Sequence, residues 1–134
     1  MYETLFEDFL LHSDVLRVYD DGKLIYKSSE KMLLPLLRYI KEHVMRNHGV
    51  VVFDKIAGNA AALLLVIARC KEVYSPIASK PAVTTLDQYH IKHHFLEVVP
   101  FIQKAGTEEI CPMEKMSLNS PSPENFYQKL KDLV

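Results

Sequence analysis

Residues 50–75 read VVVFDKIAGNAAALLLVIARCKEVYS, and this stretch decides the fold. Residues 50–53 form an unbroken apolar run, which is typical of a strand covered on both faces. Residues 55–69 are apolar almost all round and predict a helix buried on more than one side, with Asp54 as its N-cap. Residues 72–75 predict the next strand. A strand, a buried helix and a strand in about 26 residues indicate a right-handed parallel crossover.

The segments before residue 50 predict a hairpin between two helices. The predicted elements are a helix over 3–12, strands over 15–19 and 23–26, and a helix from 33 to about 45. The Asp-Asp-Gly turn at 20–22 is a strong hairpin signal, so we expect its two strands to be antiparallel. Pro35 suits the first turn of the second helix, because a helix leaves the N–H groups of that turn unpaired.

The segments after residue 75 continue the alternation of helices and strands. They predict a helix from 79–82 to about 93, a strand over 95–99, a helix start at 111–114 and a final helix from 120–124. The whole order predicts one α/β domain over residues 1–134, with three α-β-α layers. Its mixed sheet should have about five strands, with the hairpin antiparallel and the other strands parallel.

Composition and charge exclude several classes of protein. The chain has 134 residues, of which 49% are hydrophobic and 25% charged, as in an average globular protein. At this length, folding removes roughly two-thirds of the unfolded surface from water, which is enough for a core. Sixteen basic and seventeen acidic residues give a net charge of −1, and the basic residues are scattered. Because nucleic-acid binding normally needs a basic cluster, we expect no nucleic-acid partner.

The sequence also predicts a cytoplasmic location. Its first residues are acidic, where a signal peptide would be basic. The longest apolar run, residues 60–68, is too short for a membrane span of about twenty residues. Cys70 and Cys111 are too few for a disulfide framework, so both should be free thiols in a reducing cytosol.

Several polar residues follow the predicted parallel strands, where open α/β sheets bind their ligands. Asp54, Lys55, Ser75 and Ser79 all fall at such strand ends. Asp54 is either a ligand-binding group or only a helix cap. Lys55 in the first turn of a helix faces an unfavourable dipole, so it needs a partner, either Asp54 or a substrate group. Gly58 and the alanines that follow make a slender helix, which permits either a ligand or tight packing.

A second candidate region is Cys-Pro-Met-Glu at residues 111–114. Pro at the first helical position and an acid at the third resemble a capped helix start. A thiol at a helix N-terminus is more acidic than usual, although a nearby carboxylate such as Glu114 opposes this or serves as acid/base partner. The alternative is a buried Cys111 that acts as a small apolar residue. Cys70, at the end of an apolar helix, is expected to be inert.

Other catalytic patterns are weak or missing from the sequence. His90, His93 and His94 have a spacing seen in metal sites, but no acidic third ligand follows, so we interpret them as a solvated cluster. The chain has neither a Gly-rich phosphate loop nor a Gly-x-Ser-x-Gly motif. It has no Cys-x-x-Cys motif either.

Three segments in order resemble a prokaryotic family of unknown function with a cytidine-deaminase-like fold. They are FDKIAGNAAA at 53–62, VPFI at 99–102 and CPME at 111–114. The family pattern is roughly Ala-Asp-Lys-Val-Val-Gly-Lys-Ala-Ala-Ala, then Val-Pro-x-Ile, then Cys-Pro-Met-Glu. This chain departs from it at residues 31–34, at Asn59 in place of Lys, and at Gln103-Lys104 in place of Asn-Arg. If those positions contact a ligand, the ligand or its affinity differs here.

The fold that this resemblance implies is also that of zinc-dependent deaminases, but their ligands are missing. Such enzymes need a His or Cys two residues before a catalytic Glu, and a Pro-Cys-x-x-Cys pair. No His-x-Glu occurs, and Cys70-Lys71-Glu72 fits only in its letters because we place it at a helix end. We therefore predict no zinc site, no other metal and no cofactor.

Together the residues predict a small-molecule site at the carboxyl edge of the sheet. Analogy with deaminase-like proteins suggests a nucleotide- or ribose-containing ligand. In an enzyme, Cys111 would be the nucleophile, Asp54 or Glu114 the acid/base, and Lys55 the group that stabilises negative charge. The remaining ligand-binding positions are Gly58, Asn59, Ser75 and Ser79. The alternative is a non-catalytic binding or sensor domain, and whether the chain forms a homo-oligomer is open.

Overall fold

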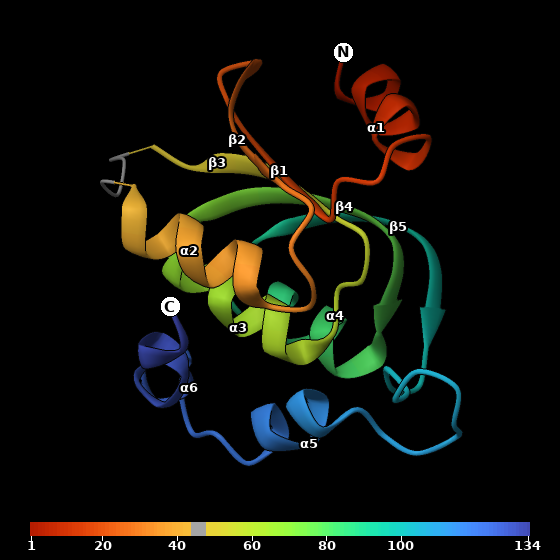
Figure 1. Ribbon diagram of the computed structural model, residues 1–134, viewed down its shortest axis with the longest axis vertical. Coiled ribbons are helices and arrows are strands. Elements are labelled where there is room, and N and C mark those ends of the chain that lie inside the picture. Colours follow the sequence, from red (N-terminus) through yellow and green to blue (C-terminus); the bar gives the residue numbers. More distant parts are fainter. Residues whose placement is uncertain (44–47) are drawn as a thin grey trace.

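The computed structural model describes residues 1–43 and 48–134, which form a five-stranded sheet and the helices around it (Figure 1). The strands are β1 (Leu16–Asp20), β2 (Lys23–Ser28), β3 (Val50–Asp54), β4 (Cys70–Ser79) and β5 (Lys92–Val99). The helices are α1 (Tyr2–Leu10), α2 (Leu34–Glu42), α3 (Asn59–Ile67), α4 (Lys80–Gln88), α5 (Pro112–Leu118) and α6 (Pro123–Leu130), followed by a 3-10 turn at Lys131–Leu133. Among the described residues, no helix is both long and apolar enough to cross a membrane.

The sheet is mixed, with the strand order β2-β1-β3-β4-β5. β1 pairs antiparallel with both β2 and β3, whereas β3, β4 and β5 are parallel. This confirms the predicted antiparallel hairpin and the predicted parallel crossover. Both crossovers step in the same direction along the sheet, so α3 and α4 cover the same face.

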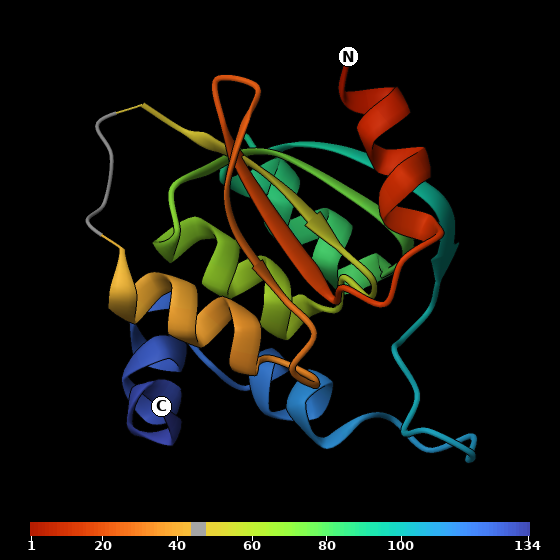
Figure 2. The ribbon, with the colours of Figure 1, turned by 45° about the horizontal axis from the view of Figure 1, so that its top comes forward.

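Helices lie on both faces of the sheet, but unequally (Figure 2). One face carries the main core, which α2, α3, α4 and α6 cover. The other face carries a smaller aromatic cluster beneath α1, built on Phe6, Phe9 and Phe53. β3 shows why both faces are covered: Val50 and Val52 point into the main core and Val51 and Phe53 into the aromatic cluster. The α-β-α arrangement is therefore confirmed.

The start of α3 differs from the prediction. The helix begins at Asn59 with Gly58 as its N-cap, so Asp54 is the last residue of β3 and not a helix cap. The reason is a tertiary contact that extends the pairing of the chain with β4. Ala57 donates its N–H to the Ile77 carbonyl at 2.9 Å and accepts a bond from the Ser79 N–H at 3.1 Å. Both bonds are incompatible with a helix over the same residues.

The end of α4 also differs from the prediction. α4 stops at Gln88 rather than near His93, because His90 takes a positive φ of 59° and the chain turns into β5. α2 ends at Glu42, and the predicted end at residue 45 falls outside the described residues. The predicted helix starts at 79–82 and 120–124 are confirmed, with Ser79 and Ser122 as the N-caps, because each hydroxyl accepts an N–H bond from the first turn that follows.

Candidate functional site

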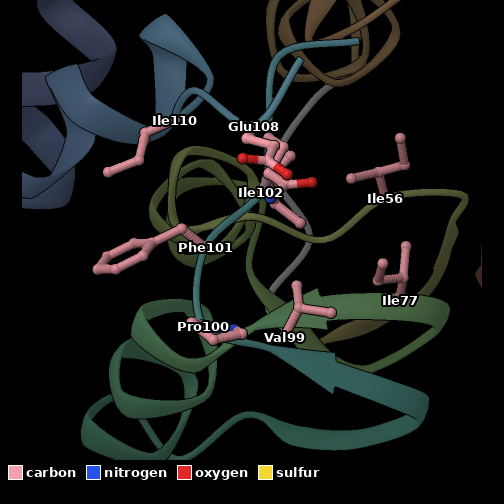
Figure 3. A pocket seen from close by; sticks show the side chains of 9 residues that line it. Ile56, Ile77, Val99, Pro100, Phe101, Ile102, Glu108 and Ile110 are labelled. Carbon is pink, nitrogen blue, oxygen red and sulfur yellow. The ribbon is translucent and has the colours of Figure 1, made fainter. Parts of the chain in front are cut away.

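A cavity of about 400 Å³ opens at the carboxyl ends of β4 and β5 (Figure 3). Ile56 and Ile77 lie on one side of it and Phe101 on the other. Nine residues line it: Ile56, Ile77, Val99, Pro100, Phe101, Ile102, Gln103, Glu108 and Ile110. This is the edge of the sheet where the sequence places a site, but none of the predicted site residues is among the nine.

Beside the cavity, the Glu114 carboxylate is the centre of a buried group of polar contacts. Its Oε1 accepts the Asn59 N–H at 2.6 Å and the Ser79 hydroxyl at 3.2 Å, and its Oε2 accepts the Ile102 N–H at 2.6 Å. The residue is 2% exposed. We call Gly58, Asn59, Ser79, the Ile102 N–H and Glu114 the Glu114 cluster.

The position of this carboxylate is electrostatically favourable because it lies at a helix start. Asn59 is the first residue of α3, and Ser79 is the N-cap of α4. The positive ends of helix dipoles stabilise an anion there. With both oxygens occupied by donors from three segments, Glu114 joins α3, α4 and the chain after β5 to α5. Its arrangement is that of a structural tie.

Asn59 and Ser79, both predicted as ligand-binding, are also buried and fully engaged. The Asn59 side chain donates to the Ser117 hydroxyl at 3.1 Å and accepts from the Thr85 hydroxyl at 2.5 Å, so it bridges α5 and α4. Ser79 accepts the Ala82 N–H at 3.2 Å while its hydroxyl donates to Glu114. Gly58 permits this close packing. A Cβ there would lie 3.0 Å from Ile102 Cγ1 and 3.4 Å from Glu114 Oε1.

Asp54 is a second buried carboxyl, but it has weaker partners. It is 7% exposed, and its Oδ1 accepts the Ile56 N–H at 3.3 Å. Burial raises the pKa of Asp54 to about 7, opposed by the N–H groups of Ile56 and Lys55. Its strand neighbour one step beyond the Phe53–Tyr74 pair is Ser75, which is also buried. The Ser75 hydroxyl donates to the Ile77 carbonyl at 2.9 Å.

Lys55 is not in a helix, and its hydrogen-bond partners are backbone carbonyls rather than Asp54. Its Nζ donates to the carbonyls of His12 and Asp14, each at 2.6 Å. The same ammonium lies 4.3 Å from the centre of the Phe9 ring. The side chain thus fastens the loop between α1 and β1 to the end of β3. The prediction that Lys55 lies in the first turn of a buried helix is wrong.

Cys111 lies at the start of α5, as predicted, with Pro112 as the first helical residue. The thiol is partly exposed, and the Cys111 N–H donates to the Ile102 carbonyl at 2.9 Å. Ile102 lines the cavity, and so does Ile110, the residue that precedes Cys111 in the chain. The Cys111 backbone therefore lies next to the cavity wall.

His90, His93 and His94, interpreted from the sequence as a solvated cluster, lie outside the helices. His93 and His94 belong to β5 and contact different carboxylates, Asp87 at 2.9 Å and Glu72 at 2.5 Å. Within residues 1–43 and 48–134, no group of three His, Cys, Asp or Glu side chains could hold a metal ion. Cys70 opens β4 rather than ending a helix, and burial raises its pKa to about 12, which keeps the thiol protonated.

Sequence reasoning did not predict the cavity, although the family resemblance drew attention to residues 99–102 and to Gln103, which line it. The available signal was the apolar run at residues 99–102, which directly follows a strand at the carboxyl edge of the sheet. An apolar run with no helical or alternating pattern outside a strand is typical of a pocket wall or a loop packed on the core. The rest of the lining includes Glu108 and Ile110, which no local pattern identifies.

Comparisons with known proteins identify a family and a solved structure to which the chain is similar. A family model described as "TM1506: Domain of unknown function (DUF1893)" matches residues 6–134. The crystal structure of a DUF1893 family protein (TM1506) from Thermotoga maritima is similar, with a TM-score of 0.88 and 25% identity, over 99% of this chain and 89% of that chain. No curated protein matches the chain. The predicted resemblance to a family of unknown function is confirmed, and the likenesses do not bear on a deaminase motif.

Proposed function

Because the chain belongs to the DUF1893 family, whose description assigns no activity, we propose a function from its own site. The protein is a binding domain that takes a small, largely apolar molecule into the cavity at the carboxyl ends of β4 and β5. The observation that carries this proposal is the cavity itself, whose volume of about 400 Å³ lies in the range of small-molecule sites.

The lining indicates the chemical class of the ligand. Seven of the nine lining residues are apolar, and the other two are Gln103 and Glu108. None of these described lining residues is basic, so the walls offer no cation for a phosphate. Glu108 instead favours a neutral or cationic group. The walls therefore support an uncharged or cationic apolar molecule better than the nucleotide that the resemblance suggests.

Binding without chemistry is the reading that the polar residues support. Both carboxylate oxygens of Glu114 accept bonds from buried donors, and the Lys55 ammonium is bonded to two carbonyls. A general acid or base must reach a reacting group. A lysine ammonium that stabilises developing negative charge must also reach the reacting group. In this structure Glu114 and Lys55 are instead hydrogen-bonded to other groups of the same chain.

A titration with three related probes tests the proposal. Indole, tryptamine and indole-3-acetate share a ring system but are neutral, cationic and anionic. We expect indole and tryptamine to shift the amide signals of residues 99–103 and 108–110 in ¹H–¹⁵N spectra. Indole-3-acetate should bind about tenfold more weakly, because it meets Glu108 in a wall without cations.

Matched tryptophan substitutions locate the binding. Ile110→Trp fills the cavity from a position that is 38% exposed, and Leu133→Trp adds the same ring at a position that is 61% exposed and outside the lining. The first should abolish the shifts and the second should leave them unchanged. Absence of shifts at the cavity amides in the unaltered protein, with all three probes, would reject the proposal.

A cysteine-dependent enzyme is the second candidate, favoured by one observation. Cys111 is partly exposed, and its backbone joins two residues of the cavity wall, Ile102 and Ile110. An activated thiol would react with iodoacetamide at pH 6 far faster than a cysteine peptide does. Cys111→Ser identifies the reacting residue. A rate equal to that of the peptide removes this candidate and leaves binding.

A further inference from the structure

A second cavity, of about 310 Å³, lies among the helices that cover the main core. α4, α5 and α6 all pack against α3, and the cavity is a groove between α4 and the segment that joins α5 to α6. Asn59 and Leu63 of α3 contribute to its lining and are buried, whereas Gln88 and Tyr89 at the end of α4 are exposed. We call this cavity the α4–α6 groove. It shares no lining residue with the cavity at the ends of β4 and β5.

The lining of the α4–α6 groove is polar but carries no charge. Seven of its thirteen residues are Ser, Thr, Asn or Gln. None of these thirteen described residues is Lys, Arg, His, Asp or Glu, although 25% of the residues in the chain are charged. A phosphate or carboxylate would find no cationic side chain there, and a charged group left unpaired in a groove loses hydration without compensation. The groove therefore favours a neutral polar molecule.

The hydroxyl groups of the groove define what this molecule must offer. Thr85 donates its hydroxyl hydrogen to Asn59 Oδ1 at 2.5 Å. Ser117 and Ser120 donate theirs to backbone carbonyls of α5, at 2.5 Å and 3.2 Å. A hydroxyl that already donates keeps lone pairs with which it can accept a further bond. A molecule that pairs with these oxygens must therefore bring hydrogen-bond donors of its own.

The exposed side of the groove adds two groups that the chain leaves without partners. Within the part of the chain that the structure describes, neither the Gln88 amide nor the Tyr89 hydroxyl has a hydrogen-bond partner. The amide offers both donors and an acceptor. The Tyr89 ring, which is 38% exposed, offers an apolar face with a polar tip. This side of the groove thus suits a molecule with donors and acceptors around an apolar surface.

We propose that the α4–α6 groove binds a neutral sugar of one ring. Each sugar hydroxyl both donates and accepts, so it can pair with the serine and threonine oxygens and with both ends of the Gln88 amide. The carbon face of the ring then lies against Tyr89. A volume of about 310 Å³ is at the lower end of the range for small-molecule sites, which fits a single ring. This site is separate from the apolar cavity of the proposed function, and its ligand is chemically different.

Titration with neutral and charged sugars tests the proposal. We expect D-glucose, D-galactose or D-ribose, added to about 100 mM, to shift the amide signals of residues 84–89 and 117–120 saturably in ¹H–¹⁵N spectra. D-glucuronate and D-glucosamine should bind no more tightly than D-glucose, because the lining has no partner for either charge. The absence of saturable shifts at these amides with all three neutral sugars overturns the proposal. So does binding of either charged sugar at least tenfold tighter than that of D-glucose.

Matched glutamine substitutions locate the site. Gln88→Ala and Gln128→Ala remove the same side chain from exposed positions, and Gln128 is on α6 outside the lining. The first should raise the dissociation constant of the tightest neutral sugar about tenfold, and the second should leave it unchanged. Tyr89→Ala should weaken the sugar at least as much and leave the indole titration unchanged, which separates the two cavities. Unchanged sugar affinity in both Gln88→Ala and Tyr89→Ala would overturn the proposal and leave the binding of indole unaffected.

Discussion

The Glu114 cluster and the cavity lie side by side, yet they are built from opposite chemistry. In the cluster a buried carboxylate meets three donors within 3.2 Å, and the Asn59 side chain meets two hydroxyl groups. In the cavity most of the wall is hydrocarbon. Ile102 belongs to both, since its N–H bonds to Glu114 while its side chain lines the cavity.

This difference shows that a polar signature does not by itself mark a site of chemistry. The Cys-Pro-Met-Glu segment and the residues around Gly58 resemble a catalytic pattern, but Glu114 and Asn59 fasten helix ends to one another. The polar cluster holds the chain after β5 in place, and that chain forms the cavity wall. In the proposed function, the cluster is the support and the cavity the binding surface.

Removing the Glu114 carboxylate has the largest expected effect on this comparison. Glu114→Ala leaves two N–H groups and one hydroxyl buried without an acceptor, each at a cost of about 1–3 kcal/mol. We expect the free energy of unfolding to fall by about 5 kcal/mol in urea titrations. Glu114→Gln, which keeps one acceptor oxygen, should lose about half as much. Glu124→Ala, on an exposed helix start, is the control and should change stability by less than about 1 kcal/mol.

If Glu114→Ala proved nearly neutral, the cluster could not be the support of the cavity wall. A Glu114→Ala variant that stays folded but loses the indole-induced shifts would also show that the cavity wall depends on the Glu114 cluster. The two readouts together separate a structural tie from a group that touches the ligand.

Asp54 offers the next test, because it is a buried carboxyl without the donors that Glu114 has. Its folded pKa, about 7, lies above the unfolded value near 4, so the folded state keeps a proton that the unfolded state releases. Stability from this group is therefore greatest below about pH 4 and falls as pH rises through 7. Between about pH 5 and 7 the loss should be about 2 kcal/mol.

The measurement is the urea unfolding free energy of the wild type and of Asp54→Asn over that range of pH. Asn keeps the size of the side chain and does not titrate, so the difference between the two curves isolates Asp54. A difference that stays constant with pH would mean that Asp54 is ionised in the folded protein.

Replacing Lys55 should have a smaller effect on stability. It tests whether this residue only holds the loop after α1 or also takes part in the proposed site. Lys55→Met keeps the alkyl chain but loses two bonds to carbonyls and the contact with the Phe9 ring. We expect about 1.5 kcal/mol less stability in urea. The affinity for indole should not change, because no Lys55 atom lines the cavity. A loss of indole binding at unchanged stability would place Lys55 in the site after all.

The sequence predicts an element well where neighbouring residues determine it and poorly where distant residues do. The apolar run of β3, the existence of a buried helix after it and the helix starts at 79–82 and 120–124 rest on neighbouring residues, and these predictions hold. The start of α3 rests on pairing between Ala57 and Ala78, 21 positions apart. The partners of Lys55 lie 41 and 43 positions away. No periodicity carries such information.

The cavity was missed for a related reason. Its wall depends on a chain between β5 and α5 that has little regular structure. A bridge between Gln103 and Ile110 holds this chain through the bonds from the Cys111 N–H to the Ile102 carbonyl and from the Lys104 N–H to the Glu109 carbonyl. The bond from the Ile102 N–H to Glu114 fixes it further. The sequence shows Glu114 as an acid in the first turn of a helix, and only the folded chain shows that its carboxylate reaches residue 102.

Gly58→Ala should have the smallest effect on stability and the most informative one on binding. Its φ of −80° suits alanine, so backbone strain is absent, and the cost comes from the Ile102 side chain, 3.0 Å from the new Cβ. Ile102 must move by a few tenths of an ångström, at about 1 kcal/mol. Because the same side chain lines the cavity, indole affinity should fall about threefold, as ¹H–¹⁵N titration would show. Ala62→Gly, in the same helix but away from the cavity, should lose similar stability and keep its affinity. If both variants bound indole equally well, the two regions would be independent, and the support that the cluster gives to the wall would extend only to the backbone of Ile102.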